Sequence, residues 1–184
     1  MKKLNFLTVT FVSILGLTSC SNDDNGPVNE EEVITTVVTK LTGGGQVINL
    51  ISRDLDGDGP NAPVVTVSGN LIANTTYLGE TSFLNELVNP ADDITIEVEE
   101  EGTDHQLFYQ IPTSLGVINY TDLDANGKPI GLTFSYTTAN ASTGNLTVTL
   151  KHLPNKSAVG VTDGDITNAG GATDALVVYP IIIQ

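Results

Sequence analysis

The sequence predicts an all-β fold, an antiparallel sandwich, and three features of the chain support this prediction. From Val33 onward, short runs of β-branched residues are separated by turns rich in Gly, Asn, Asp and Pro, a rhythm typical of antiparallel sandwiches and barrels. Most runs alternate apolar and polar residues, as strands with one buried and one solvated face do. The chain has a single cysteine, so an internal disulfide is excluded and the fold depends on its core and its backbone pairing.

Nine segments carry the strand pattern. They are residues 33–41, 46–54, 63–69, 75–84, 106–112, 116–122, 131–138, 145–153 and 175–183. In the eighth segment, for example, Leu146, Val148 and Leu150 fall on one face. The last segment is apolar on both faces, and its Pro180 cannot donate to a sheet ladder, so we expect an edge strand or a bulge there.

A weak internal repeat relates residues 47–68 to residues 117–135. Both stretches contain a strand, the sequence Asp-Leu-Asp, a glycine turn and a second strand. We expect two similar hairpins with their acidic tips at the same end of the sandwich. The alternative is that any sandwich contains such hairpins, since Asn126-Gly127 is a common hairpin turn.

Residues 89–102 are the one segment that predicts a helix. Asn89 is a candidate N-cap, Pro90 suits the first helical position, and Asp92 and Asp93 suit the first turn. Ile94, Ile96 and Val98 alternate as a strand would, but the start signals and the closing Gly102 favour a short helix between strands.

The N-terminus is typical of an exported protein. Met1-Lys2-Lys3 precede an apolar run that is too short for a comfortable membrane span and fits a secretion signal. The run ends in Leu17-Thr18-Ser19-Cys20, which resembles the lipobox of bacterial lipoproteins. The resemblance implies that residues 1–19 are a signal peptide and that Cys20 carries a diacylglycerol and usually a third, palmitate-like acyl chain. Several acyl chains anchor a protein where one would not; the alternative is an ordinary signal peptide followed by a stray thiol.

Residues 20–32 are predicted to be an acidic flexible tether, and residues 33–184 a single domain. The acidic residues directly after Cys20 resemble the surface-export signal of lipoproteins from the Bacteroidota, although a merely solvated tether explains them too. The chain thus resembles surface lipoproteins of that phylum with an immunoglobulin-like sandwich. The resemblance implies a lipid-anchored protein of the outer membrane and cell surface, in the company of an outer-membrane transporter for nutrients.

The charge excludes one class of partner. The chain has a formal net charge of −15, and removal of residues 1–19 takes away Lys2 and Lys3. A chain so acidic, without a basic stripe, repels nucleic acid, and anionic lipid headgroups are disfavoured as direct ligands. Cations are its natural partners, although charge can also serve only solubility.

Two acidic loops are candidate calcium sites. Asp54, Asp56 and Asp58 precede Gly59 at the spacing of a calcium loop, but Val65 stands where such a loop has its bidentate glutamate. A second loop repeats the spacing with Asp122, Asp124 and Asn126 and carries less charge. In each case the alternative is a solvated acidic turn.

His105 is a candidate ligand for a transition metal. It follows Glu99, Glu100, Glu101 and Asp104, and a histidine beside carboxylates can bind zinc or copper. Such sites usually need more nitrogen or sulfur ligands, and His152 is the other imidazole of the chain, far from His105 in sequence. The alternative is an ordinary surface histidine.

Nothing in the sequence predicts an enzyme. Cys20 is expected to be acylated, no nucleophile-elbow pattern occurs, and the glycine run at residues 43–45 precedes a strand, so it is a turn and not a phosphate cradle. We therefore expect a non-enzymatic binding or accessory module, anchored through Cys20, with calcium as a candidate stabilising ion and nutrient uptake as its setting. The alternatives are a surface carbohydrate-binding protein, which a row of exposed tyrosines would favour, and a metal-capture protein acting through His105.

Overall fold

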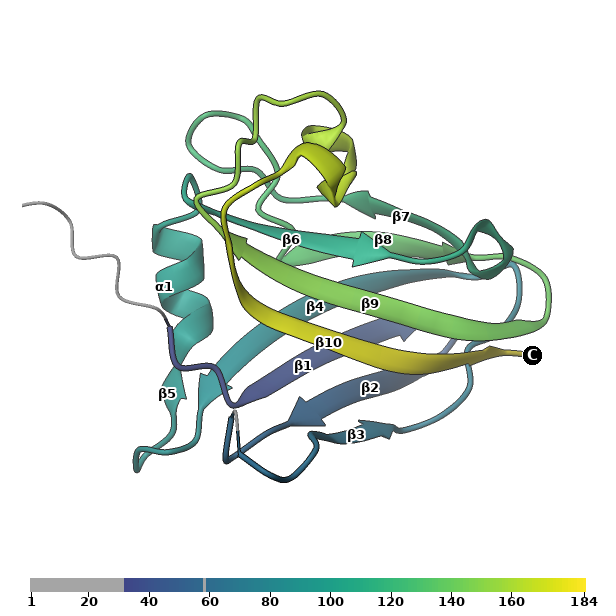
Figure 1. Ribbon diagram of the computed structural model, residues 1–184. Coiled ribbons are helices and arrows are strands. Elements are labelled where there is room, and N and C mark those ends of the chain that lie inside the picture. The colour runs from purple at the N-terminus through teal and green to yellow at the C-terminus, as the bar shows by residue number, and fades with distance from the viewer. Residues whose placement is uncertain (1–31, 58) are drawn as a thin grey trace, which may run out of the picture. The chain divides into compact units, whose positions relative to one another are not determined.

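Two antiparallel sheets face each other across an apolar core in the computed structural model, which describes residues 32–57 and 59–184 (Figure 1). The larger sheet has the strand order β3-β2-β1-β4-β8-β7, with β5 paired to β4, and the smaller sheet has the order β10-β9-β6. The elements are β1 Thr36–Gly43, β2 Gln46–Arg53, β3 Val64–Val67, β4 Thr76–Asn85, β5 Asp92–Asp93, α1 Ile94–Glu100, β6 His105–Gln110, β7 Gly116–Tyr120, β8 Thr133–Thr138, β9 Ser142–His152 and β10 Ala172–Ile183. Short 3-10 turns occupy Thr113–Leu115, Val161–Asp163 and Ile166–Asn168.

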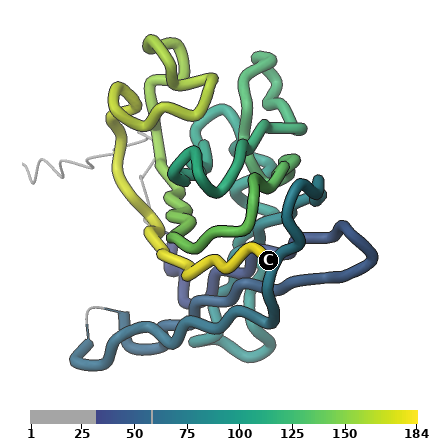
Figure 2. The backbone as a smooth tube through the Cα atoms, turned by 90° about the vertical axis from the view of Figure 1, so that its right-hand side faces the viewer, coloured from purple at the N-terminus to yellow at the C-terminus, as the bar shows by residue number. Residues whose placement is uncertain are grey.

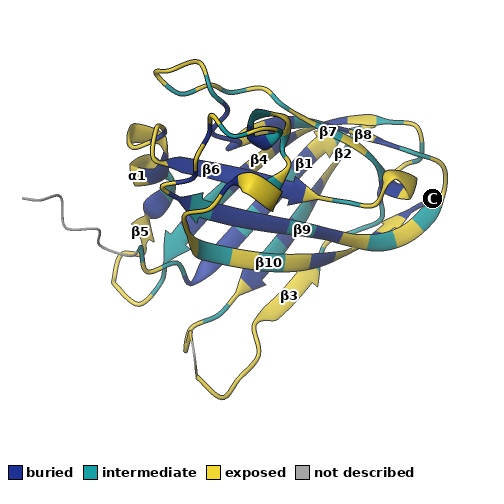
Figure 3. Cartoon of the chain, turned by 45° about the horizontal axis from the view of Figure 1, so that its top comes forward, coloured by how far each residue is buried: buried dark blue, intermediate teal, exposed yellow. Residues whose placement is uncertain are grey.

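The all-β sandwich predicted from the sequence is confirmed. Each of the predicted strand segments contains a strand of the structure, although several ends differ by a few residues. Along β9, Leu146, Val148 and Leu150 are buried as predicted, and the buried faces of the two sheets form a continuous core, visible as dark bands along the strands in Figure 3. Periodicity of two therefore determines which side chains face inward.

The outer face of the smaller sheet is covered by residues of the segment 153–171. Phe108 on β6 points away from the main core and packs with Val161 and Ala169 of the segment 153–171. Gln106 on the same face donates from Nε2 to the carbonyl oxygen of Val161 at 2.7 Å. Because this face is covered, β6 is buried at five successive positions, from His105 to Tyr109.

The predicted helix exists, but its predicted start is wrong. The helix begins at Ile94 with Asp93 as its N-cap, whose carboxylate accepts from the backbone N–H of Thr95. Asp92 and Asp93 are not in a first helical turn, because their extended backbone pairs with the end of β4. Ile94 and Val98, four residues apart, are buried, whereas Ile96 is 56 % exposed, so helical spacing and not alternation decides the burial.

The two related hairpins are β2–β3 and β7–β8. Strands β2 and β7 run in the same direction, because four antiparallel steps separate them in the larger sheet. Their acidic loops therefore lie at the same end of that sheet, as expected, but at opposite edges. Figures 1 and 2 show the loop after β7 beside the segment 153–171, on the side of the molecule opposite the loop after β2.

Pro180 lies in an edge strand. Strand β10 pairs with β9 along one side. Near its end, the N–H of Leu71 donates to the carbonyl oxygen of Ile182, and the carbonyl oxygen of Leu71 accepts from the N–H of Gln184. A bulge also occurs in β10, but at residues 173–175 and not at the proline. Proline at an edge discourages the addition of a further strand.

Candidate metal centre

His105 and His152 stand opposite each other on neighbouring strands. The antiparallel register of β6 and β9 pairs these two residues. His152 lies on the same inward face of β9 as Leu150, two residues before it. His105 lies on the same inward face of β6 as Leu107. The imidazole rings stack with their centroids 4.6 Å apart and an angle of 22° between their planes. Strand register thus brings two nitrogen donors to one end of the smaller sheet.

Asp174 joins the histidines through a bulge in β10. Ala172 pairs with His152, and the register shifts between Thr173 and Ala175, leaving Asp174 as the inserted residue. A bulge bends a strand and redirects a side chain. The Asp174 side chain, 1 % exposed, has an Oδ2 atom 4.0 Å from Nε2 of His105.

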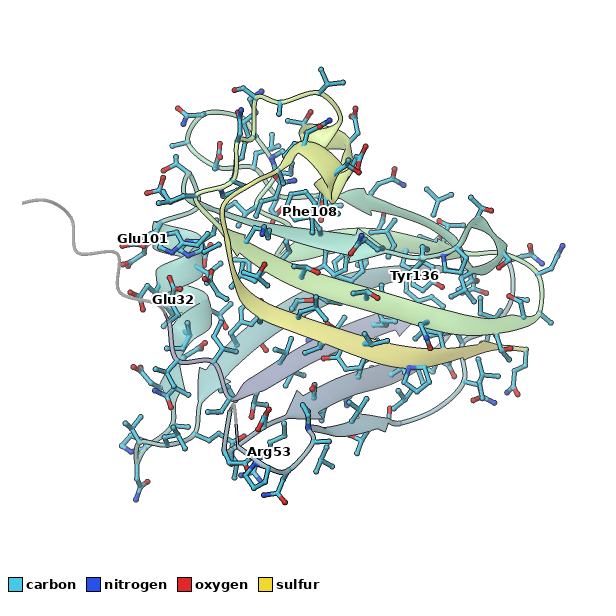
Figure 4. The ribbon with its side chains drawn as sticks, in the orientation of Figure 1. Glu32, Arg53, Glu101, Phe108 and Tyr136 are labelled. Carbon is cyan, nitrogen blue, oxygen red and sulfur yellow. The ribbon has the colours of Figure 1, made fainter. Side chains whose placement is uncertain are left out.

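Glu32 supplies the fourth side chain, and it comes from outside the smaller sheet. Glu32 precedes β1, and its Oε1 lies 2.8 Å from Nε2 of His105. Its Oε2 lies 4.0 Å from Nδ1 of His152. Figure 4 shows Glu32 at the end of the molecule where α1 lies, close to Glu101.

These four residues, Glu32, His105, His152 and Asp174, form what we call the histidine-acid cluster. One potential ligand atom of each lies within 4.8 Å of those of the other three. The side chains of the two histidines are 0 % and 9 % exposed, and that of Glu32 is 3 % exposed. Among the described residues, Nδ1 of His152 and Oε2 of Glu32 have no hydrogen-bond partner. Buried polar atoms are rarely left without a partner, and a bound ion would supply one.

The hydrogen bonding of His105 favours metal coordination. Its Nδ1 lies 3.2 Å from the carbonyl oxygen of Glu101. A carbonyl only accepts, so a ring proton on Nδ1 would leave the lone pair of Nε2 for a metal ion, which would replace the 2.8 Å hydrogen bond between Nε2 and Glu32. Metal-bound histidines usually have this support, with the second ring N–H donated to a carbonyl or carboxylate.

The donor set suits a divalent transition metal. Two neutral imidazoles and two carboxylates balance the charge of one divalent ion, which removes the cost of burying unpaired carboxylates. Mixed nitrogen and oxygen donors suit zinc better than calcium or magnesium, which prefer oxygen alone. Tetrahedral zinc holds its ligand atoms roughly 3.3 Å apart at bond lengths of about 2.0–2.1 Å. Three distances in the cluster are 2.8 Å, 4.0 Å and 4.0 Å, and all four ligand atoms lie within 4.8 Å of one another, so small shifts would bring them to a zinc ion.

Further carboxylates surround the entrance to the cluster. Glu97 on α1 and Glu101, which caps the helix, are exposed and have carboxylate oxygens within 4.8 Å of Glu32. Burial and then the negative charges of Glu101 and Glu32 raise the pKa of Glu97 above its ordinary value. Grouped negative charge of this kind raises the local concentration of cations.

The sequence indicated His105, with His152 as the other imidazole, but not the two carboxylates that join them. Among the described residues, the carboxylates of the cluster come from Glu32 and Asp174, not from the neighbours Glu99, Glu100 and Asp104, while Glu101 contributes only its backbone carbonyl. The expectation of a surface histidine is wrong, since His105 is fully buried. Its alternation with Leu107 and Tyr109 was the signal that could have placed it inside.

The first candidate calcium loop is held by hydrogen bonds of its own. Oδ1 of Asp54 accepts from the backbone N–H groups of Asp56 and Gly57 at 3.3 Å and 3.0 Å. Oδ2 of Asp56 accepts from the side chain of Asn61 at 2.7 Å. Asp58 lies outside the described residues. Calcium binding by this loop stays a prediction.

In the second candidate loop, the aspartate carboxylates also accept hydrogen bonds from the surrounding chain. Asp122 accepts from the backbone N–H groups of Gly131 and Thr133 at 2.7 Å and 2.9 Å. Asp124 accepts from the N–H of Asn126 at 2.8 Å and from Nζ of Lys156 at 2.9 Å. A calcium ion at Asp124 would have to compete with the ammonium group of Lys156.

The tyrosines do not form a platform for sugars. Tyr77, Tyr109, Tyr136 and Tyr179 are buried, and Tyr120 is half-buried with its hydroxyl donating to the carbonyl oxygen of Leu107 at 2.7 Å. Flat exposed aromatic rings are therefore lacking from the part of the chain that the structure describes. This arrangement does not favour the carbohydrate alternative.

The comparisons with known proteins found no match, so the chemistry of the site is the basis for its interpretation. No protein-family model, no curated protein and no solved structure matches the chain. Within residues 32–57 and 59–184, no helix has the length and apolar character to cross a membrane. The signal peptide, Cys20 and nearly all of the tether lie outside the described residues.

Proposed function

We propose that this protein is a lipid-anchored, non-enzymatic surface module that binds one divalent transition metal ion, zinc by the match of its donors, through the histidine-acid cluster. The observation that carries the proposal is the convergence of two imidazoles and two carboxylates, each at least nine-tenths buried, from four separate parts of the chain. An ordinary buried hydrogen-bond network does not need to leave a nitrogen of His152 and an oxygen of Glu32 without partners.

The cluster supports a resident ion rather than a catalytic one. Catalytic zinc sites keep a coordination position for water or substrate beside three protein ligands, whereas structural sites are closed by four protein ligands. The four side chains of the cluster fill a tetrahedral shell, and their burial slows exchange with water. This favours a stabilising metal over the capture and release of metal as cargo.

The anchor and the setting rest on the sequence. The lipobox-like Leu17-Thr18-Ser19-Cys20 and the acidic residues that follow support a surface lipoprotein, and such proteins often accompany outer-membrane transporters. In this proposal the domain is an accessory or binding part of a nutrient-uptake system, held at the membrane by Cys20.

Zinc titration by calorimetry tests the proposal on the chain carrying Cys20→Ser, which keeps every described residue. We expect one zinc ion per chain. His152→Ala should weaken binding by roughly 100-fold or more, since even loss of a residue that only supports a ligand costs about 10–100-fold. The matched control is Asp163→Asn, which removes an exposed carboxylate elsewhere and should leave the affinity unchanged.

Two results would contradict the proposal. One is a wild-type chain that takes up no zinc. The other is a His152→Ala chain that binds zinc as tightly as the wild type, because the metal would then be held by surface carboxylates.

A further inference from the structure

Glu32 differs from the other members of the histidine-acid cluster in its place in the fold. His105, His152 and Asp174 come from the three strands of the smaller sheet. Glu32 instead lies just before β1, the strand at which the chain enters the larger sheet. It also lies where the predicted tether meets the domain. An ion in the cluster would therefore connect the start of one sheet to the end of the other.

The chain around Glu32 has few other attachments. Thr35 is fixed to β4 and the residue after it, because its N–H donates to the carbonyl oxygen of Leu84 at 2.9 Å and its hydroxyl accepts from the N–H of Glu86 at 2.8 Å. Within the described part of the chain, neither Val33 nor Ile34 makes a hydrogen bond. Val33 is 52 % exposed. Ile34 is half-buried and packs against the main core, so the weakly attached residue is Val33, and Glu32 beyond it is held through the cluster.

A pocket open to solvent lies beside this segment. It has a volume of about 460 Å³, and its lining includes residues 32–35 and the part of β10 that starts at Asp174. Residues of β1 and β2 and of the loop after β2 complete the lining. Packing against β10 is therefore incomplete here, and the segment is attached at Ile34 and Thr35 on one side and at the cluster on the other.

We propose that the metal ion acts as a clasp that fastens residues 32–34 to the smaller sheet and so fixes the point at which the tether joins the domain. The inference rests on the proposed metal site and adds a second role to it. With the ion bound, Glu32 is tied to strands β6, β9 and β10 by coordination. Without it, the described contact is the hydrogen bond between Glu32 and His105.

Backbone ¹⁵N relaxation of Val33 and Ile34, recorded with and without saturating zinc on the chain carrying Cys20→Ser, tests the clasp. We expect the order parameter of the Val33 amide to rise from below about 0.6 to about 0.85 when zinc binds, whereas Ile34, which packs on the core, should change less. In Glu32→Gln, zinc should still bind through the other three ligands, roughly 10–100-fold more weakly, while the Val33 amide keeps its low order parameter. Asp163→Asn, which removes an exposed carboxylate outside the cluster, should respond like the wild type.

The outcomes separate the clasp from the site. If the wild type binds no zinc, the metal site and the clasp both fail. If zinc binds, but Glu32→Gln has wild-type affinity or the wild-type order parameters do not rise, the site stands and the clasp is overturned.

Discussion

Zinc is expected to raise the thermal unfolding temperature of this protein by about 8–16 °C at a free concentration 1,000 times its dissociation constant. A ligand that binds only the native state at that concentration stabilises it by about 4.1 kcal/mol. For a domain of this size each kcal/mol shifts the midpoint by about 2–4 °C. The His105→Ala chain should show a much smaller rise, because it lacks the imidazole that lies near both Glu32 and Asp174 and should bind zinc roughly 100-fold more weakly.

Differential scanning calorimetry or circular dichroism measures this shift, with chelator as the baseline and magnesium as the control ion. Asp163→Asn should keep the full response to zinc. An equal rise in wild type and His105→Ala would contradict the site. A rise specific to calcium and abolished by Asp56→Ala would instead support the loop of residues 54–59 as a calcium site.

The second large effect is expected at Lys156, whose side chain is buried. Its Nζ donates to Asp124 at 2.9 Å, to the carbonyl oxygen of Pro129 at 3.0 Å, and to that of Gly102. Burial lowers the pKa of Lys156, while its hydrogen bond with Asp124 and the charge of Asp124 act in the opposite direction. Lys156→Ala leaves the Asp124 carboxylate, 1 % exposed, buried without its counter-charge, so we expect a loss of about 3–5 kcal/mol in the free energy of unfolding.

Urea denaturation measures this loss, and two further variants give the comparison. Lys156→Met combined with Asp124→Asn should be less destabilised than Lys156→Ala, because no unpaired charge is left behind. Lys151→Ala removes a lysine that is not buried and that binds Gly171 and Thr173, and it should cost less than about 1 kcal/mol. A cost below about 1 kcal/mol for Lys156→Ala would contradict the expectation that a buried Asp124 without its counter-charge destabilises the fold.

The strands could be predicted because their signal is local. Alternation at period two identified the buried faces, and Pro180 indicated the edge strand. The helix start was wrong for a non-local reason, since Asp92 and Asp93 satisfy helix rules but pair with Leu84 and Asn85 of β4. Local preference yields to sheet pairing when the two compete.

The candidate site could be predicted only in part, because its members meet through tertiary structure. Glu32 lies 73 residues from His105 along the chain. His152 reaches His105 only through the register of β6 and β9, and Asp174 turns inward only because of a bulge. Neither register nor a bulge can be read from composition or spacing. The sequence could therefore indicate His105 as a candidate metal ligand and His152 as the remaining imidazole, but it could not show that the two meet and could not name Glu32 and Asp174.

X-ray absorption spectroscopy at the zinc edge tests the central claim most directly, on the chain carrying Cys20→Ser loaded with one equivalent of zinc. The histidine-acid cluster predicts four-coordinate zinc with two imidazole nitrogens and two carboxylate oxygens at about 2.0–2.2 Å. A spectrum of six oxygen ligands without the imidazole signature would contradict it and would place any bound zinc on the acidic surface.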